Sequence, residues 1–306
     1  MLRTIYRMLR VVARHLLLAL RSLMSTLRIL YHSKYEKIPK VNGNKRLIIC
    51  GNGPSLGKQL QENADVFQSN DVLCVNQFSA TEWFFSIKPR YYCIMDPVSA
   101  SDPEILIADI RQRIDVAWAA LESVDWEMEL ILPRYFQRSK YLRERVRRLS
   151  IHVRYLNTAE FSGWPFLQNY FLKKQLCAPG AQTVLIAAVY YGICKGYKEI
   201  ILLGAEMSWF KEIEVDEENH VYFNYSHFYG EKNKRRLMNE NGIPISVAEE
   251  LEYEARAFRE YMFLAAYAKK MKCAIYNATP NSLVDAFERK RLSSLLSLKT
   301  EEEVGR

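Results

Sequence analysis

The 306-residue sequence has few of the short motifs that normally identify a ligand site. Its glycine turn, Gly51-Asn52-Gly53, lacks the third glycine of the dinucleotide fingerprint G-x-G-x-x-G. No Lys-Ser/Thr follows at the distance that a P-loop requires, which excludes that class of nucleotide site. The six cysteines include no C-x-x-C pair and lie mostly in apolar runs. This pattern favours buried free thiols in a reducing compartment over disulfides or a metal site.

Charge is scarce outside the first 35 residues. Residues 1–35 contain seven Lys or Arg and no Asp or Glu, whereas the whole chain has a net charge of +8. Residues 36–306 therefore carry a net charge of only +1. Nucleic-acid-binding domains concentrate positive charge on a binding face, so we expect no nucleic-acid partner.

Residues 1–31 lack a long uninterrupted apolar run. Arginine recurs at every seventh position from Arg7 to Arg28, among Leu, Ile, Val and Met. The spacing predicts one amphipathic helix, because the arginines interrupt every apolar run before the ~18 residues of a spanning helix. We expect this helix to lie on an anionic membrane surface. A helix that assembles a homo-oligomer and an organellar transit peptide remain alternatives.

After a polar linker, short apolar runs alternate with helical patterns. The apolar runs predict strands at residues 47–50, 71–75, 91–95, 129–132, 151–156, 199–203 and 273–276. Helical patterns fall between them, for example at residues 103–113, 139–149 and 183–195. The alternation predicts an α/β fold, a Rossmann-like, doubly wound and mostly parallel sheet with helices on both faces.

Four parts follow from this organisation. We expect a basic helix and linker at residues 1–35, a Rossmann-like nucleotide-binding domain at 36–207, an active-site lid at 208–245, and a last helix, strand and tail at 246–306. The lid is expected because its aromatic, histidine and charged residues interrupt the alternation. Ser246, followed three residues later by a glutamate, predicts a capping box that starts the last long helix.

The stretch Leu47–Leu56 combines a buried strand, the glycine turn and a helix start. Backbone N–H groups at such a helix N-terminus point outward and can hold a phosphate, and Asn52 adds a side-chain amide. A tight structural turn is the alternative. Polar residues or glycines also follow other predicted strands, at Asn76, Asp96 and Gly204 and near Asn281. Because ligands of parallel sheets bind at the carboxyl ends of the strands, we expect a nucleotide site at this edge.

Five motifs in order resemble the bacterial lipooligosaccharide sialyltransferases, family 42 of the glycosyltransferases. Cys50–Leu56 is similar to the family's A/C-G-N-G-P-S-L, and Val75–Phe78 resembles C-N-Q-F. The other matches are G-Y-K-E-I followed by a strand and glycine at residues 196–204, N-S-H-Y-x-G-H at 225–231, and C-x-P-N-S-L-L at 279–283. The resemblance covers residues 45 to about 292, and residues 1–31 lie outside it.

The resemblance implies an inverting, metal-independent transfer of sialic acid or a related acid sugar from a CMP donor, with no cofactor. The acceptor would be lipooligosaccharide or another cell-surface glycan, reached from the cytoplasmic face of the bacterial inner membrane. The absence of D-x-D agrees with metal independence. Lid tyrosine hydroxyls would stabilise the departing phosphate. The expected donor-binding residues are Asn52, Gly53, Ser55, Asn76, Asp96, Thr183, Gly204, Tyr222, Tyr225 and Asn281.

Two positions depart from the family. Its general base, the last histidine of N-S-H-Y-x-G-H, is Glu231 here, and His227 matches the earlier histidine. The pKa of imidazole favours His227, whereas position favours Glu231, so both stay candidates. Asp96 replaces an asparagine and is common in flagellin-glycosylation accessory proteins and archaeal pterin diphosphokinases. The alternatives are therefore a magnesium-dependent diphosphate transfer with Asp96 as metal ligand, a flagellin-glycosylation accessory protein, or a non-catalytic membrane-bound nucleotide-binding scaffold.

Overall fold

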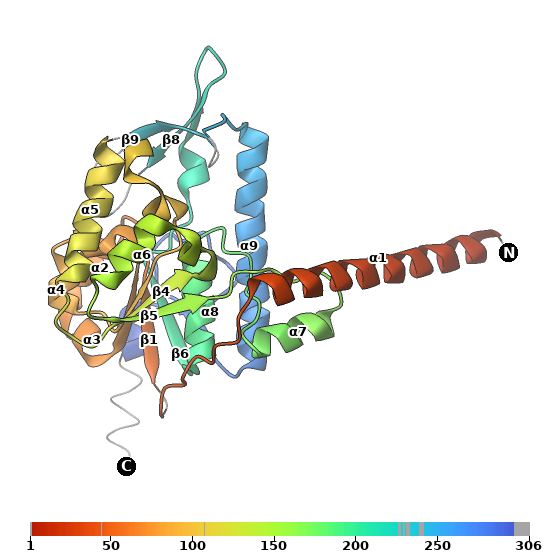
Figure 1. Cartoon of the computed structure of the whole chain (residues 1–306), viewed down its shortest axis with the longest axis horizontal. Coiled ribbons are helices and arrows are strands. Elements are labelled where there is room, and N and C mark those ends of the chain that lie inside the picture. The colour runs from red at the N-terminus through yellow and green to blue at the C-terminus, as the bar shows by residue number, and fades with distance from the viewer. Residues whose placement is uncertain are drawn as a thin grey trace.

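The computed structural model describes residues 2–43, 45–106, 108–225, 228, 230, 233–238 and 242–296. Within them, an eight-stranded parallel sheet is flanked by helices, a smaller antiparallel sheet stands apart from it, and the first helix extends away from the body (Figure 1). The strands of the large sheet are β1 (Arg46–Cys50), β2 (Asp71–Val75), β3 (Tyr91–Cys93), β4 (Glu129–Pro133), β5 (His152–Leu156), β6 (Glu199–Leu203), β10 (Ala274–Asn277) and β11 (Glu288–Arg289).

The helices fill the connections between these strands. The α-helices are α1 (Leu2–His32), α2 (Leu56–Glu62), α3 (Ala64–Ser69), α4 (Trp83–Ile87), α5 (Ala108–Glu122), α6 (Lys140–Arg147), α7 (Pro165–Lys173), α8 (Val184–Lys195) and α9 (Val247–Lys270). Short 3-10 turns are η1 (Asn76–Ala80), η2 (Pro97–Ala100), η3 (Pro103–Ile105), η4 (Arg134–Arg138) and η5 (Trp209–Glu212). The predicted α/β class is confirmed. The helix expected from residue 103 starts later, because Asp102 caps a separate turn there and Leu106 is extended.

The strand order of the large sheet is β11-β10-β6-β1-β2-β3-β4-β5, and every neighbouring pair is parallel. The chain builds the sheet outward from β1, first through β2 to β5 and then through β6 to β11. The boundary between β1 and β6 is therefore the topological switch point, where open α/β sheets bind their ligands.

Both faces of the sheet are covered, which explains why its central strands are continuous apolar runs. In β1, Leu47 and Ile49 pack into the cluster that includes residues of α7, α8 and α9. Ile48 and Cys50 point to the opposite face and pack with residues of α2 to α6. All five residues of β1 are buried. The turns that follow β1 and β6 therefore begin from strands that are fixed in the core.

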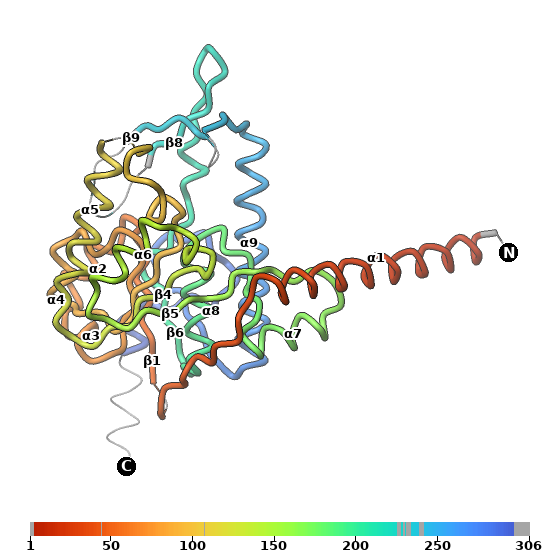
Figure 2. The backbone as a smooth tube through the Cα atoms, viewed as in Figure 1, coloured from red at the N-terminus to blue at the C-terminus, as the bar shows by residue number. Residues whose placement is uncertain are grey.

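Helix α1 confirms the helix predicted over residues 1–31, and only its final turns pack on the body. The Ser25 hydroxyl donates to the carbonyl oxygen of Ser162 (2.9 Å), and the N–H of Trp164 donates to the Ser22 hydroxyl (2.9 Å). Gly163 permits this approach, since a Cβ there would lie 2.2 Å from the Ser22 hydroxyl. Figure 2 shows the rest of α1 projecting beyond α7.

Among the described residues, no helix is both long enough and apolar enough to cross a bilayer.

The predicted lid contains the small sheet, in which β7 (Ile213–Val215), β8 (Val221–Tyr225) and β9 (Asn233–Arg236) are antiparallel. It has its own apolar cluster, including Phe223 and Leu237. The chain then enters α9 through the predicted capping box, with the Ser246 hydroxyl accepting from the N–H of Glu249 at 3.2 Å. The division of the chain into four parts stays a prediction.

Candidate functional site

The turns after β1 and β6 are interlocked at the switch point. The N–H of Gly51 donates to the carbonyl oxygen of Leu203 (2.8 Å), and the N–H of Gly53 donates to that of Gly204 (2.9 Å). A Cβ on Gly51 would lie 2.4 Å from the Gly204 carbonyl oxygen, and Gly204 has a φ of +60°. Glycine is needed at these positions because two backbones meet and one of them is left-handed.

A carboxylate of the protein itself occupies the N-terminus of α2. The N–H of Ser55 donates to Glu206 Oε1 (2.7 Å), and a Cβ on Gly53 would lie 1.6 Å from Glu206 Oε2. The N–H groups of Gly51, Gly53 and Ser55 are therefore used within the protein. The expectation that these groups point outward to a phosphate is wrong, because Glu206 supplies the negative charge that the helix dipole favours.

The N-terminus of α8 supplies a different position for an anion. Gln182, Thr183, Val184 and Leu185 line the same cavity as the turn residues. The Thr183 hydroxyl is within 2.9 Å of the Tyr261 hydroxyl and makes no capping hydrogen bond. The first N–H groups of a helix have no partner inside the helix, and its N-terminus is electropositive. This twelve-residue helix therefore directs its positive end at the cavity.

The cavity, here called the cleft, has a volume of about 650 Å³. Its walls come from the ends of β1, β2, β3 and β6, from the start of α8, from η5, β8 and α9. It brings together six of the predicted donor-binding residues, namely Asn52, Gly53, Asn76, Asp96, Thr183 and Gly204. A volume of roughly 300–1,000 Å³ suits a nucleotide-sized ligand.

Three of the remaining predicted residues lie outside the cleft. Ser55, Tyr222 and Asn281 do not line the cleft, and Tyr222 hydrogen-bonds to Asp216 in the lid. The side chain of Tyr225, and the whole of His227 and Glu231, fall outside the described residues. Their proposed roles stay predictions.

Asparagines hold the strand ends of the cleft in place. The Asn52 amide donates to the Val75 carbonyl oxygen (3.1 Å), which ties the turn after β1 to the end of β2. Asn76 has a φ of +48°, and its Oδ1 accepts from the N–H of Met95 (3.2 Å). Met207 is also left-handed, with a φ of +51°. Such strained backbone is typical of functional sites.

The lid reaches the cleft from β8 and from the residue Phe228. Phe223 and Asn224 of β8 line the cavity. The N–H of Phe228 donates to the Asn52 carbonyl oxygen (3.3 Å), and its ring packs 5.6 Å from that of Phe78. The lid thus contacts the glycine turn directly.

The described lining of the cleft is acidic. It contains five carboxylates and no Lys, Arg or His, the carboxylates being Asp96, Glu206, Glu212, Glu250 and Glu254. Glu250 and Glu254 are each only 8% exposed. No three carboxylate, histidine or cysteine ligand atoms of the described cleft lie close enough together to hold one metal ion. The cleft carboxylates are thus spread around the wall instead of converging on a point.

Glu254 is the most perturbed of these groups. Burial raises the pKa of its carboxyl to about 7, the charge of Glu250 adds to the rise, and a hydrogen bond from Trp209 opposes it. Among the described residues, Oε2 of Glu254 has no hydrogen-bond partner. Burial also raises the pKa of Glu250. The pair therefore places a group that exchanges a proton near neutral pH on the wall of the cleft.

Glu206, Glu250 and Glu254 were not among the predicted site residues. Glu206 stands two residues after Gly204, the glycine that follows β6, and the strand-end rule that selected Gly204 applies to it as well. Glu250 and Glu254 are four residues apart on the same helical face as the buried Ala257, Tyr261 and Leu264. Carboxylates on the apolar face of a helix are a sequence signal that could have identified them.

No protein-family model matches this sequence, and no curated protein matches it. Among solved structures, the chain is similar to the MAf glycosyltransferase from Magnetospirillum magneticum AMB-1, at 10% identity and a TM-score of 0.48. The match covers 92% of this chain and 40% of that one, so the chain spans about two fifths of its length. So distant a similarity carries no argument about the reaction, and the fold class rests on the sheet itself. The resemblance to family 42 stays a prediction.

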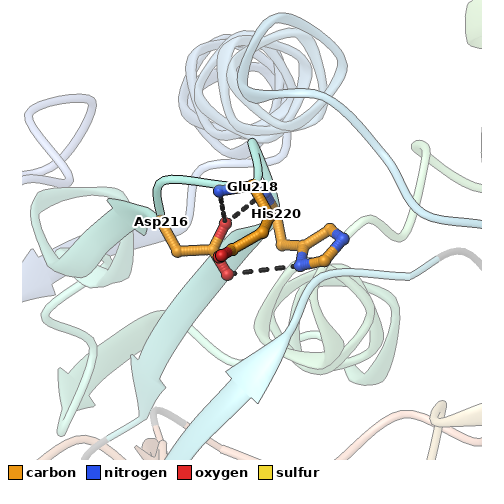
Figure 3. A group of neighbouring side chains, drawn as sticks. All are labelled: Asp216, Glu218 and His220. Atoms are coloured by element: carbon orange, nitrogen blue, oxygen red, sulfur yellow. Dashed lines mark hydrogen bonds and ion pairs between the residues drawn. The ribbon is translucent and has the colours of Figure 1, made fainter.

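A second cluster of possible ligands lies in the turn between β7 and β8 (Figure 3). Asp216 Oδ1 accepts from the N–H groups of Glu218 (3.1 Å) and His220 (2.7 Å), and Oδ2 lies 3.2 Å from His220 Nδ1. Asn219 has a φ of +59°. These hydrogen bonds close a tight turn, and the turn explains why the three side chains lie together. None of the three residues lines the cleft.

Proposed function

We propose that the chain is a glycosyltransferase that binds a CMP-activated acid sugar in the cleft. The observation that carries the proposal is the position of the cleft at the switch point of a parallel sheet, facing the N-terminus of α8. The nucleoside would lie along Asn52, Asn76 and Gly204, and the phosphate at Thr183. The choice of CMP and of sialic acid or a related sugar is supported only by the motifs shared with family 42.

In an inverting transfer, an acceptor hydroxyl attacks the anomeric carbon as the bond to the CMP phosphate breaks. The electron pair of that bond leaves with CMP, and the hydroxyl proton passes to a base. His227 and Glu231 are the bases that the resemblance implies. Glu254 is a further candidate base from the described cleft, since its carboxyl is buried and burial raises its pKa to about 7. Tyr222 and Tyr225 stay proposed contacts of the departing phosphate.

Binding is tested by a thermal-shift screen of CMP, UDP, GDP and ATP, each with and without magnesium. Stabilisation by CMP without metal supports the proposal. Transfer is then compared in His227→Ala, Glu231→Ala and Glu254→Gln, with the exposed Glu252→Gln of α9 as control. If all three cleft and lid variants keep rates within about threefold of the wild type, none of them is the base. CMP binding without any turnover would instead support a scaffold protein.

The Asp96 carboxylate favours one second candidate, a magnesium-dependent transfer of diphosphate or nucleotide. Carboxylate oxygens are preferred ligands of Mg²⁺, and Asp96 lines the cleft. The Asp96 carboxylate also accepts from the N–H of Val98 (3.1 Å), which fixes its orientation. A thermal shift by ATP that needs magnesium and is lost in Asp96→Asn would support this candidate over the first.

We further propose that residues 1–31 hold the enzyme on the anionic, cytoplasmic face of a bacterial inner membrane, where a glycolipid acceptor lies. Support comes from the exposure of large apolar residues along α1, from Ile5 to Tyr31, between arginines that can bind lipid phosphates. A truncation of residues 2–20 leaves the packed Ser22 and Ser25 in place. It should release the protein from anionic liposomes in a sedimentation assay, and unchanged sedimentation would contradict the proposal.

A further inference from the structure

A second cavity lies where α1 joins the body, and it is lined by positive charge. Its volume is about 590 Å³, and its walls come from the last turn of α1, from η4, from the segment after β5 and from α9. We call it the basic pocket. Its charged lining comprises Arg28, Lys34, Arg134, Arg138, Arg256 and Glu160, with His32 beside them. Five cations thus face one carboxylate.

Two of these cations are already neutralised inside the protein. Arg134 pairs with Glu36 (3.0 Å) and also donates to Asn157 Oδ1 (2.6 Å), and its side chain is only 11% exposed. Arg256 pairs with Glu160. These two pairs fix the wall of the pocket and contribute little net charge to it.

The other three cations have no acidic partner within 4.0 Å among the described residues. Arg28 donates to the backbone carbonyl of Glu160, and Arg138 lies 3.3 Å from His32 Nδ1. Among the described residues, Lys34 is held through its backbone, which exchanges hydrogen bonds with the Asn157 side chain. Three positive groups converging on one cavity fit an anion with several oxygens, and guanidinium groups match phosphate oxygens in pairs.

The location of the pocket indicates the source of that phosphate. It lies at the base of α1, whose free part is the proposed membrane contact, so it would face the headgroup layer. It shares α9 with the cleft, since Arg256 lines the basic pocket and Ala257 lines the cleft. A volume of about 590 Å³ is larger than a free phosphate needs.

We propose that the basic pocket binds the phosphate group of an anionic lipid headgroup. The inference rests on the proposed membrane association of α1, and it does not depend on which nucleotide the cleft binds.

The test compares two charge-matched double variants. The pocket variant combines Lys34→Gln and Arg138→Gln, which removes two cations of the basic pocket that have no acidic partner among the described residues. The control variant combines Lys58→Gln and Arg111→Gln, which removes two exposed cations from α2 and α5, on the other face of the sheet. On vesicles of phosphatidylcholine with phosphatidate, the pocket variant should bind about tenfold more weakly than the wild type, and the control within about twofold. Equal losses in both variants, or none in the pocket variant, would overturn the proposal.

A soluble ligand separates the pocket from the membrane helix. Short-chain phosphatidate below its micelle concentration should raise the melting temperature of the wild type but not of the Lys34/Arg138 variant. A variant with Leu9→Ser and Leu16→Ser in α1 should keep this shift while losing its vesicle binding. If it keeps vesicle binding, the membrane role of α1 is wrong, and the placement of the basic pocket against the headgroup layer is wrong with it. If inorganic phosphate binds as tightly as phosphatidate, the source is the free anion and the lipid assignment is wrong.

Discussion

Replacement of Glu254 by Gln should remove much of the pH dependence of folding stability in the acid-to-neutral range. Burial raises the pKa of this carboxyl from 4.5 to about 7. Between these values the native chain holds a proton that the unfolded chain has released, so a rise in pH favours unfolding. The protonated Glu254 carboxyl therefore adds its full stabilisation to the free energy of unfolding below about pH 4.5, and this stabilisation is lost as the pH rises through about 7.

The size of the stability change follows from the pKa shift of Glu254. The two pKa values differ by about 2.5 units, and each unit corresponds to about 1.4 kcal/mol, so the wild type should lose about 3 kcal/mol over this range. Glu250 acts in the same direction, because burial raises its pKa as well. A Gln at position 254 cannot ionise and still accepts a hydrogen bond from Trp209. The variant should therefore exceed the wild type by about 3 kcal/mol at about pH 8.

The assay is urea unfolding at several pH values between about 5 and 8, followed by tryptophan fluorescence. Glu252→Gln is the matched control, because Glu252 is exposed on the same helix. Its stability should follow that of the wild type at every pH. If the Glu254→Gln and wild-type curves stay parallel, with a constant difference at all pH values, Glu254 does not titrate in this range and the reasoning is wrong.

Two further predictions concern the core of the site and of the sheet. Gly53→Ala should destabilise the fold by about 1–3 kcal/mol and abolish the thermal shift by nucleotide, because its Cβ would lie 2.7 Å from the backbone carbonyl oxygen of Gly204 and 1.6 Å from Glu206 Oε2. Gly230→Ala should do neither, since no atom of the described residues lies within 4 Å of the added Cβ. Arg154→Met should cost about 3–5 kcal/mol in urea unfolding, because it leaves Glu129, only 12% exposed, without its closest partner. Lys234→Met breaks an exposed pair, and its urea unfolding curve should stay close to that of the wild type.

Much of the fold could be predicted because its signals are local. The strands around the switch point are apolar on both faces, so β1 and β6 stand out as continuous runs. The capping box at Ser246 depends on two residues three positions apart. The strand-end rule then located Asn52 and Asn76 in the cleft, since the carboxyl ends of parallel strands share one edge.

The rest depends on contacts between distant parts of the chain. Glu206 reaches the N-terminus of α2 only because β1 and β6 pair in a register that sets Cys50 opposite Leu203. Nothing near Ser55 in the sequence shows that its N–H already has an acceptor. The anion position at α8 was predicted only through the resemblance around Thr183, and the basic pocket forms from four segments that no local pattern connects.

If the chain acts as proposed, the attachment of α1 by its last turns affects how it meets its acceptor. The unpacked part, residues 2–21, is about 30 Å long at 1.5 Å per residue. Ser22, Ser25 and Gly163 fix it to the body through closely packed backbone, without a flexible tether. Enzyme and glycolipid confined to one surface would encounter each other by lateral diffusion, at a high effective concentration. A weak intrinsic affinity for the acceptor would then suffice for turnover, and detergent-dispersed acceptor should give a much higher KM than acceptor in vesicles.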